Sequence, residues 1–216
     1  MFHFEIAGIT PRDIENHNKT FNFNITKLFT GNSSGGGGDT PVNGRFVTSL
    51  DMPSGGCWWD TEYICNQDTE IRSTFMRTSN YIKYVYGDST KNVRATSSSS
   101  GAFHFGGVSV SFPIEIDTKY TIIQNKSGVT CNGEFKAYTN VPNFTSANNL
   151  IIGAMRAGDS VLFEGRLFDS FQIYQAGQLV LDWRAFVDAD GKPCFYDTVS
   201  KTNKYNLGTG TLTYTE

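Results

Sequence analysis

The sequence predicts an all-β protein in which short antiparallel strands form a sandwich or a barrel. Apolar and polar residues alternate over short runs, and turn-forming residues recur at intervals of roughly 8–12 residues, as in β-sandwiches and barrels. No segment shows the hydrophobic period of a helix. Only 18% of the residues are charged and 22 are glycines, so the fold depends on packing and strand pairing rather than on charged helix faces.

Residues 1–31 are the first expected unit, a short N-terminal arm rich in β-structure. The runs FHFEIAGI and TFNFNITKLFTG alternate apolar and polar residues, which is typical of strands. Since this segment is too short to bury a core of its own, it must pack on the main domain or on a neighbouring subunit. We expect the second, and the candidate residues for anchoring or oligomerisation are Phe2, Phe4, Phe21, Phe23, Ile25 and Phe29.

Residues 32–41 are the expected linker between this arm and a main domain at residues 42–216. They fall within the run GNSSGGGGDTP, whose composition is that of a flexible chain. Such a linker lets the arm reach a neighbouring molecule. We therefore expect a symmetric homo-oligomer, with a trimer as the expected form.

The main domain is predicted to consist of repeated short strands and polar turns. In TEIRSTFMRTS, side chains at alternate positions share one face, as for Ile71, Ser73 and Phe75. The run KYTIIQNKSGVTCNG predicts a hairpin, and the turn at residues 175–177 divides GRLFDSFQIYQAGQLVLDWRAF into two strands. The other expected strands lie in GRFVTSLDM, CWWDTEYICN, YIKYVYGD, NVRATSS, GAFHFGGVSVSF and NNLIIGAMRA.

The C-terminal third, GRLFDSFQIYQAGQLVLDWRAFVDADGKPCFYDTVSKTNKYNLGTGTL, carries a specific series of motifs. It resembles the end of the concanavalin A-like jelly-roll domains, the laminin-G-like and lectin/glucanase superfamily common in phage and bacterial surface proteins. The resemblance implies an antiparallel two-sheet jelly-roll sandwich over residues 42–216. The chain departs from the family pattern at Cys194 and at Trp183–Arg184. The matching residues are Gly165, Arg166, Ile173, Tyr174, Leu181, Asp182, Asp190, Gly191, Phe195, Tyr196, Asp197, Tyr205, Asn206, Gly208 and Gly210.

The stretch VDADGKPCFYDTVSKTNKYNLGTG is expected to close this sandwich. Asp190 begins a tight turn in which glycine takes the positive-φ position. Tyr196 and Tyr205 are expected to bury their rings and to keep their hydroxyls hydrogen-bonded. Asp197 is expected to cap local backbone N–H groups. The candidate residues for the closure are Asp190, Gly191, Tyr196, Asp197, Tyr205 and Gly208.

Asp188, Asp190 and Gly191 also have the beginning of a calcium-loop pattern. An EF-hand loop needs further oxygen ligands and a terminal bidentate glutamate, and the residues that follow offer only Asp197. We therefore predict a turn and no metal at this place.

The run PIEIDTKY bears on catalysis. Some glucanases of the superfamily carry Glu-x-Asp-x-Glu on one strand, where alternation places all three carboxyls on one face. Here Glu115 and Asp117 fit the first two positions, but Lys119 takes the third and cannot replace the carboxylic acid that a retaining mechanism requires. We predict the entry to a strand, with solvated charges, and no enzyme activity. His104 is interpreted as a packed or hydrogen-bonded strand residue.

The candidate carbohydrate-binding residues are Trp58, Trp59 and Tyr63. Neighbouring residues of a regular strand face opposite ways, so only one of the two tryptophans belongs in the core. The other is either a platform for sugar stacking or a ring that packs against a subunit or the arm; the second is commoner for large aromatic residues.

Charge and composition exclude several classes of function. The net charge is −3 and no cluster of basic residues occurs, which argues against nucleic acid as a partner. No run approaches the ~18 apolar residues of a membrane span, and the N-terminal residues lack the features of an export signal.

The spacing of the cysteines and histidines is not that of a zinc site. The four cysteines are Cys57, Cys65, Cys131 and Cys194. We expect free thiols and no cofactor.

Two hypotheses for the function remain. The first is a non-enzymatic accessory protein of a phage particle, such as a capsid decoration, head-fibre or tail-associated protein, made in the host cytoplasm and located in the virion. Its partners would be other virion proteins and, weakly, host surface glycans. The second is a soluble carbohydrate-binding module or a relative of the glycoside hydrolases. The resemblance, the N-terminal arm and the missing third carboxylate favour the first.

Overall fold

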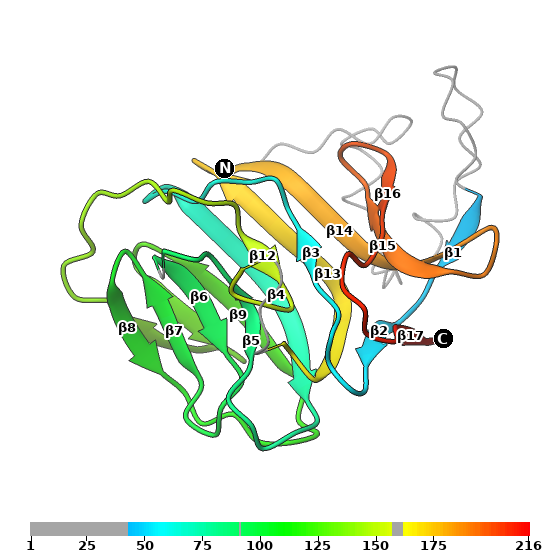
Figure 1. Ribbon diagram of the computed structural model, residues 1–216. Coiled ribbons are helices and arrows are strands. Elements are labelled where there is room, and N and C mark those ends of the chain that lie inside the picture. The colour runs from blue at the N-terminus through cyan, green and yellow to red at the C-terminus, as the bar shows by residue number, and fades with distance from the viewer. Residues whose placement is uncertain (1–42, 91, 157–161) are drawn as a thin grey trace, which may run out of the picture. The chain divides into compact units, whose positions relative to one another are not determined.

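The computed structural model describes residues 43–90, 92–156 and 162–216, and the chain divides into two units, residues 1–41 and Val42–Glu216. The predicted arm with its anchoring residues, and the predicted linker, lie outside the described residues. Within the described part, the chain forms two antiparallel sheets that pack as layers (Figure 1). The predicted all-β sandwich is therefore confirmed.

The larger sheet has eleven strands among the described residues. Their main spatial order is β11 (Glu134–Ala137), β10 (Gly128–Cys131), β9 (Tyr120–Asn125), β4 (Thr69–Arg77), β13 (Gly165–Gln175), β14 (Gln178–Asp188), β15 (Pro193–Asp197) and β16 (Thr202–Lys204). In addition, β1 (Gly44–Phe46) pairs with β14, β2 (Ser49–Met52) pairs with β13, and β17 (Thr213–Thr215) pairs with β2.

The smaller sheet has six strands among the described residues. Their order is β3 (Trp59–Asp60), β12 (Ile151–Ile152), β5 (Tyr84–Gly87), β6 (Val93–Thr96), β7 (Ala102–Phe105) and β8 (Val108–Ser111). Figure 1 shows the green strands of this sheet in front of β4, β9 and β13 of the larger one. The outer face of β4, β13 and β14 is thus the face that the smaller sheet leaves uncovered.

Alternation along the strands places the core between the two sheets. On β4, Ile71 and Phe75 are buried while Arg72 between them is exposed. Aromatic rings join the layers, for example Tyr86 of β5 and Phe171 of β13, whose centroids are 5.5 Å apart in an edge-on contact. Each large apolar side chain that leaves water in this way contributes about 1.5–3 kcal/mol.

A buried polar group also connects the layers. Gln124 of β9 is fully buried. Its side-chain oxygen accepts a hydrogen bond from the Tyr86 hydroxyl at 2.6 Å, and its amide donates to the carbonyl of His104 at 2.7 Å and to the Tyr138 hydroxyl at 2.8 Å. Because every polar atom of the amide is satisfied, its burial carries no desolvation penalty that is left uncompensated.

Three expected strands are shorter in the structure than the alternation indicates. GRFVTSLDM is two strands, β1 and β2, because its halves pair with different partners. Only Trp59–Asp60 of CWWDTEYICN is a strand, since Glu62 has a positive φ of 58°. NNLIIGAMRA contains only β12.

The predicted strand entry with solvated charges at PIEIDTKY is confirmed. The segment leads from β8 into β9, which begins at Tyr120, and the side chains of Glu115, Asp117 and Lys119 are exposed. A turn at residues 116–117, where Asp117 has a positive φ of 54°, interrupts the extended backbone before β9.

The closing stretch is organised by Asp188 more than by Asp190. Gly191 has a positive φ of 79°, as expected for the turn. Asp188 Oδ1 accepts the backbone N–H groups of Asp190 at 3.0 Å and Lys192 at 2.9 Å. Its Oδ2 accepts the Tyr205 hydroxyl at 2.7 Å, so both oxygens that a calcium ion would use already have protein donors.

The remaining closing residues divide between buried and exposed positions. Tyr196 is buried beside Phe186, with ring centroids 5.3 Å apart. Tyr205 keeps its hydroxyl bonded but the residue is 36% exposed, so the predicted burial of this tyrosine is wrong. Asp197 accepts the Val199 N–H at 3.0 Å. At position 208 a Cβ would collide with the carbonyl oxygen of Gly56, which explains the glycine there.

Candidate functional site

Of the two adjacent tryptophans, Trp59 is the core residue. Its side chain is 1% exposed, and its ring lies edge-on to Phe195 with centroids 5.0 Å apart. Its Nε1–H donates to the carbonyl of Lys204 at 3.2 Å. A ring enclosed in this way has no free face for a sugar, so Trp59 is removed from the candidate carbohydrate-binding residues.

Trp58 is partly buried against the closing stretch. Its backbone N–H donates to the side-chain oxygen of Asn206 at 3.0 Å, and its carbonyl accepts the N–H of Leu207 at 3.0 Å. A Cβ at Gly208 would lie 2.8 Å from the Trp58 ring. Part of the indole therefore packs on residues 206–208, and only the remainder faces solvent.

Tyr63 lies at the ends of two strands of the larger sheet. Its hydroxyl contacts Thr69 at 3.1 Å, and it also donates to the side-chain oxygen of Gln175. It thereby joins the first residue of β4 to the last residue of β13. These two strand ends border an open groove on the outer face of the sheet, so Tyr63 supports that groove from behind.

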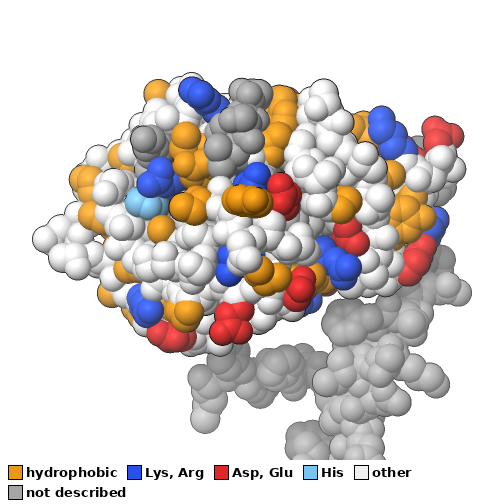
Figure 2. Space-filling view, turned by 60° about the horizontal axis from the view of Figure 1, so that its bottom comes forward, with side chains coloured by type: hydrophobic (Ala, Val, Ile, Leu, Met, Phe, Trp, Pro, Cys, Tyr) orange, Lys and Arg blue, Asp and Glu red, His pale blue; other side chains and the backbone are white. Residues whose placement is uncertain are grey.

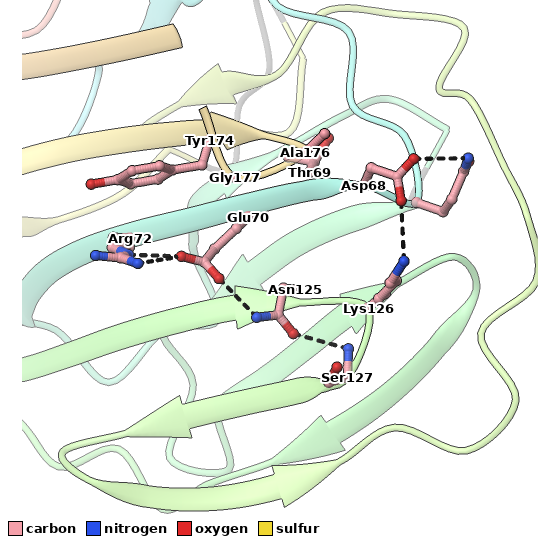
Figure 3. A pocket seen from close by; sticks show the side chains of 11 residues that line it. Asp68, Thr69, Glu70, Arg72, Asn125, Lys126, Ser127, Tyr174, Ala176 and Gly177 are labelled. Carbon is pink, nitrogen blue, oxygen red and sulfur yellow. Dashed lines mark hydrogen bonds and ion pairs between the residues drawn. The ribbon is translucent and has the colours of Figure 1, made fainter. Parts of the chain in front are cut away.

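The groove is the candidate site (Figure 3). It has a volume of about 360 Å³ and lies where β4 begins, β9 turns into β10, and β13 turns into β14. The residues that line it include Asp68, Glu70, Arg72, Asn125, Lys126 and Tyr174.

A stacked pair forms one wall of the groove. The guanidinium carbon of Arg72 lies 4.4 Å from the centroid of the Tyr174 ring. Glu70 holds the guanidinium in place, because its Oε1 accepts from Arg72 Nε at 2.8 Å and lies 2.7 Å from Arg72 Nη2. The Arg72 side chain is nevertheless 45% exposed. The pair thus offers a flat surface with polar groups at its edge.

Polar groups from the β9–β10 turn form the opposite wall. Asn125 donates to Glu70 Oε2 at 2.9 Å and accepts the backbone N–H of Ser127 at 2.9 Å. Lys126 lies 3.1 Å from Asp68 Oδ1. Figure 3 shows Asn125 directed toward Glu70 and Lys126 directed toward Asp68. The hydrogen bonds fix their positions before any ligand is present.

The charges of the groove balance. Glu70 is paired with Arg72, and Asp68 is paired with Lys126. Paired groups in contact with water attract a charged ligand weakly, because each charge is already offset by its neighbour. The chemistry therefore suits a ligand with many hydroxyl groups and little or no charge.

Sequence reasoning missed this groove, although a signal for it was present. In Thr69-Glu-Ile-Arg72, alternation places Glu70 and Arg72 on one face of a strand. The tyrosine that completes the wall follows about a hundred residues later on β13, and only the pairing of Glu70 with Tyr174 in the sheet brings them together.

A second hollow of about 480 Å³ lies beside Asp60, Asn149 and Arg156 at the edge of the smaller sheet. Its described lining contains amide and aliphatic side chains but no aromatic ring. It lacks the flat surface of the Tyr174 groove, which is therefore the better candidate.

His104 is a hydrogen-bonded strand residue, as predicted. It lies on β7, and Arg94 of β6 donates to its Nε2 at 2.9 Å. Burial and the neighbouring guanidinium lower the pKa of His104 from 6.5 to about 4. The folded protein thus holds the imidazole neutral, as an acceptor.

Stability is expected to fall as the pH decreases from about 6.5 to about 4, because in this range the unfolded chain binds a proton that folded His104 refuses. Since solvent reaches the ring, the loss is about 1–2 kcal/mol rather than the full value of the shift. Chemical denaturation at several pH values measures it. His104→Gln should remove this contribution to the pH dependence of stability, although His3 and His17 are still present. An unchanged pH dependence in that variant would contradict the attribution to His104.

The four cysteines are free thiols in buried positions. Burial raises the pKa of Cys57 and of Cys131 to about 11 and that of Cys194 to about 12, and it raises the pKa of Cys65 as well. Thiols in this state are poor nucleophiles and poor metal ligands.

Residues 43–90, 92–156 and 162–216 contain no group of three His, Cys, Asp or Glu residues that could hold a metal ion. They also contain no helix that is long and apolar enough to cross a membrane. On the face drawn in Figure 2, basic and acidic side chains of the described residues are interspersed, without a broad patch of either sign.

No protein-family model matches the chain, and no curated protein sequence matches it. Solved structures do match. One is described as "a putative carbohydrate binding protein" from Bacteroides ovatus, with a TM-score of 0.55 and 11% identity over 80% of this chain and 61% of that one. Another is the mouse laminin alpha1 chain, domains LG4-5, with a TM-score of 0.43 and 11% identity over 78% of this chain and 49% of that one.

The chain thus spans less than two thirds of the length of either structure. At these identities the likeness is one of fold. The two-sheet jelly-roll sandwich that the C-terminal motifs imply is confirmed at that level.

Proposed function

We propose that this chain is a non-enzymatic carbohydrate-binding domain and that the groove around Tyr174 is its binding site. The observation that carries the proposal is the combination, in one open groove, of a stacked Tyr174–Arg72 surface with carboxylate and amide side chains held by hydrogen bonds. A sugar ring has an apolar face and a rim of hydroxyls. An aromatic surface accepts the first, and fixed donors and acceptors accept the second.

The proposed binding is weak to moderate. The groove is shallow and lies on a sheet face, so a bound sugar keeps much of its surface in water. Dissociation constants between about 1 mM and 1 μM correspond to about −4 to −8 kcal/mol, which one stacked ring and a few hydrogen bonds can provide.

The absence of catalysis is part of the proposal. Two observations support it. Glu115 and Asp117 have exposed side chains on the segment between β8 and β9. Glu70 and Asp68 are engaged by Arg72 and Lys126. A glycosidase needs two carboxyl groups set across the scissile bond, one of which supplies a proton.

The location of the domain on a phage particle is the finer part of the proposal. Its support is the resemblance to jelly-roll domains of phage surface proteins, together with an apolar N-terminal arm and a glycine-rich linker at residues 32–41. In this proposal the arm binds other virion proteins or further copies of the chain, and the jelly roll contacts host glycans. Mass spectrometry of purified particles tests the location.

A glycan array followed by titration calorimetry tests the binding site. Tyr174→Ala is expected to weaken binding of the identified glycan at least about tenfold, or about 1.4 kcal/mol, because the flat surface is lost. Tyr214→Ala is the matched control, since Tyr214 also lies beneath an arginine, Arg45, at 5.5 Å. Thermal unfolding confirms that both variants are folded.

Two outcomes would count against this site. If Trp58→Ala abolishes binding while Tyr174→Ala does not, the sugar binds at the partly exposed tryptophan. If the wild-type protein binds no glycan on the array, the carbohydrate-binding function itself is refuted.

A further inference from the structure

The Tyr174 groove continues into a row of polar side chains that crosses the larger sheet. Cross-strand partners share a face of a sheet. Gln172 of β13 is the register partner of Arg72 on β4 and of Asp182 on β14. The next residues along each strand, such as Ile71, Ile173 and Trp183, point into the core. The row therefore lies on the outer face.

The two ends of the row carry the same arrangement. On β4, Glu70 binds Arg72, and on β14, Asp182 binds Arg184 through Nε at 3.1 Å and Nη2 at 3.0 Å. In each pair the carboxylate precedes the arginine by two residues, so both project from the same face of the strand. The arginine side chains are exposed to similar extents, 45% and 44%.

Strand β13 provides the connection between these pairs. Gln172 donates to Asp182 Oδ1 at 3.0 Å, and the Tyr174 hydroxyl donates to Gln172 at 3.4 Å. On the far side, Thr198 donates to Asp182 Oδ2 at 2.7 Å. The result is a continuous chain of contacts from Asn125 to Thr198, in which every member is held by a neighbour.

Asp182 is the most enclosed member of the row. Its side chain is 6% exposed. Burial acts to raise its pKa, but the hydrogen bonds from Thr198, Arg184 and Gln172 outweigh this and lower it. The carboxylate is thus a fixed anion that orients Arg184. The Nη1 group of Arg184 has no hydrogen-bond partner among the described residues and remains for a ligand.

We propose that the ligand is an extended, uncharged oligosaccharide that lies across the strands, from the Tyr174 groove to a second subsite at Arg184. The inference rests on the proposed carbohydrate-binding function and adds the shape and charge of the ligand. Arg72 and Arg184 lie on strands two positions apart, which is roughly 10 Å, so a single sugar at Tyr174 does not reach Arg184, whereas a chain of several sugars does.

The charge of the row selects an uncharged glycan. It contains two arginines, and each is neutralised by its own carboxylate. A held guanidinium is a planar hydrogen-bond donor that can bind a pair of hydroxyls. An acidic sugar would have to compete with Glu70 and Asp182 for the same groups.

The experiment measures affinity as a function of chain length. The probes are neutral oligosaccharides graded from mono- to hexasaccharide, taken from the series that binds on the array, and their uronic-acid counterparts. With the wild-type protein, affinity for the neutral series should rise at least tenfold between the shortest and the longest member. It should depend little on salt, and the uronic acids should bind no better.

Substitutions at the two ends separate the subsites. Arg184→Ala and Arg184→Lys should abolish the gain with length and leave the shortest ligand unaffected, whereas Tyr174→Ala should weaken binding of all lengths. Arg45→Ala is the matched control, because Arg45 is likewise paired with a carboxylate, Glu216, at 2.6 Å, and it should change nothing.

An affinity that is independent of length, or a length gain that persists in Arg184→Ala, would overturn the second subsite while leaving carbohydrate binding intact. Tighter, salt-sensitive binding of the uronic acids would overturn the uncharged ligand. If the wild-type protein binds none of the probes, the proposed function and this inference fail together, and that outcome differs from the others.

Discussion

Replacing Trp59 with alanine is expected to lower the free energy of unfolding by about 3–5 kcal/mol. The ring is 1% exposed and packs edge-on against Phe195. Its removal loses the transfer free energy of the indole and leaves a cavity, and the carbonyl of Lys204 loses its donor. Since single domains have total stabilities of about 5–15 kcal/mol, this one substitution removes a large fraction. Urea denaturation followed by circular dichroism measures it.

Trp58→Ala is the matched comparison for this prediction. The neighbouring indole is only partly buried, so its removal is expected to cost about 1–2 kcal/mol. A larger cost at Trp58 than at Trp59 would mean that β3 presents the opposite face to the core, and the pairing of β3 with β12 would have to be shifted by one residue.

Replacing Asp88 with alanine is expected to cost about 4 kcal/mol, because buried donors lose their acceptor. The aspartate is fully buried directly after β5. Its Oδ1 accepts from Thr90 Oγ1 at 2.8 Å and from the N–H of Asn92 at 3.0 Å. Its Oδ2 accepts from the N–H of Val93 at 3.1 Å and from Ser146 Oγ at 2.6 Å. The side chain thus holds the β5–β6 turn and ties it to a distant loop.

Two further variants sharpen this second prediction. Asp88→Asn keeps one acceptor oxygen but places N–H groups opposite two of the donors, so it should cost somewhat less than alanine but still more than 1 kcal/mol. Asp190→Ala, at an exposed aspartate of another turn, should change stability by less than about 0.5 kcal/mol. Equal, small effects at positions 88 and 190 would contradict the network seen around Asp88.

Most strands, and the face that each one buries, could be predicted from the sequence because the signal is local. Alternation in TEIRSTFMR fixes which side chains of β4 are buried, and the structure agrees. The turn at residues 175–177 and the hairpin between β9 and β10 also follow from local turn chemistry. The pattern was misleading around Glu62, where a residue with positive φ ends the strand that CWWDTEYICN was expected to form.

The sequence by itself determined the all-β class, the sandwich implied by the C-terminal motifs, and the rule that only one of Trp58 and Trp59 can be in the core. Only the tertiary structure decided which of the two it is, because that depends on the face that β3 turns toward Phe195. In the same way, it alone brought Tyr174 beside Arg72, and Gln172 between Arg72 and Asp182. Side-chain alternation is encoded within a strand, whereas the register between strands far apart in the chain is set by how both of their faces pack.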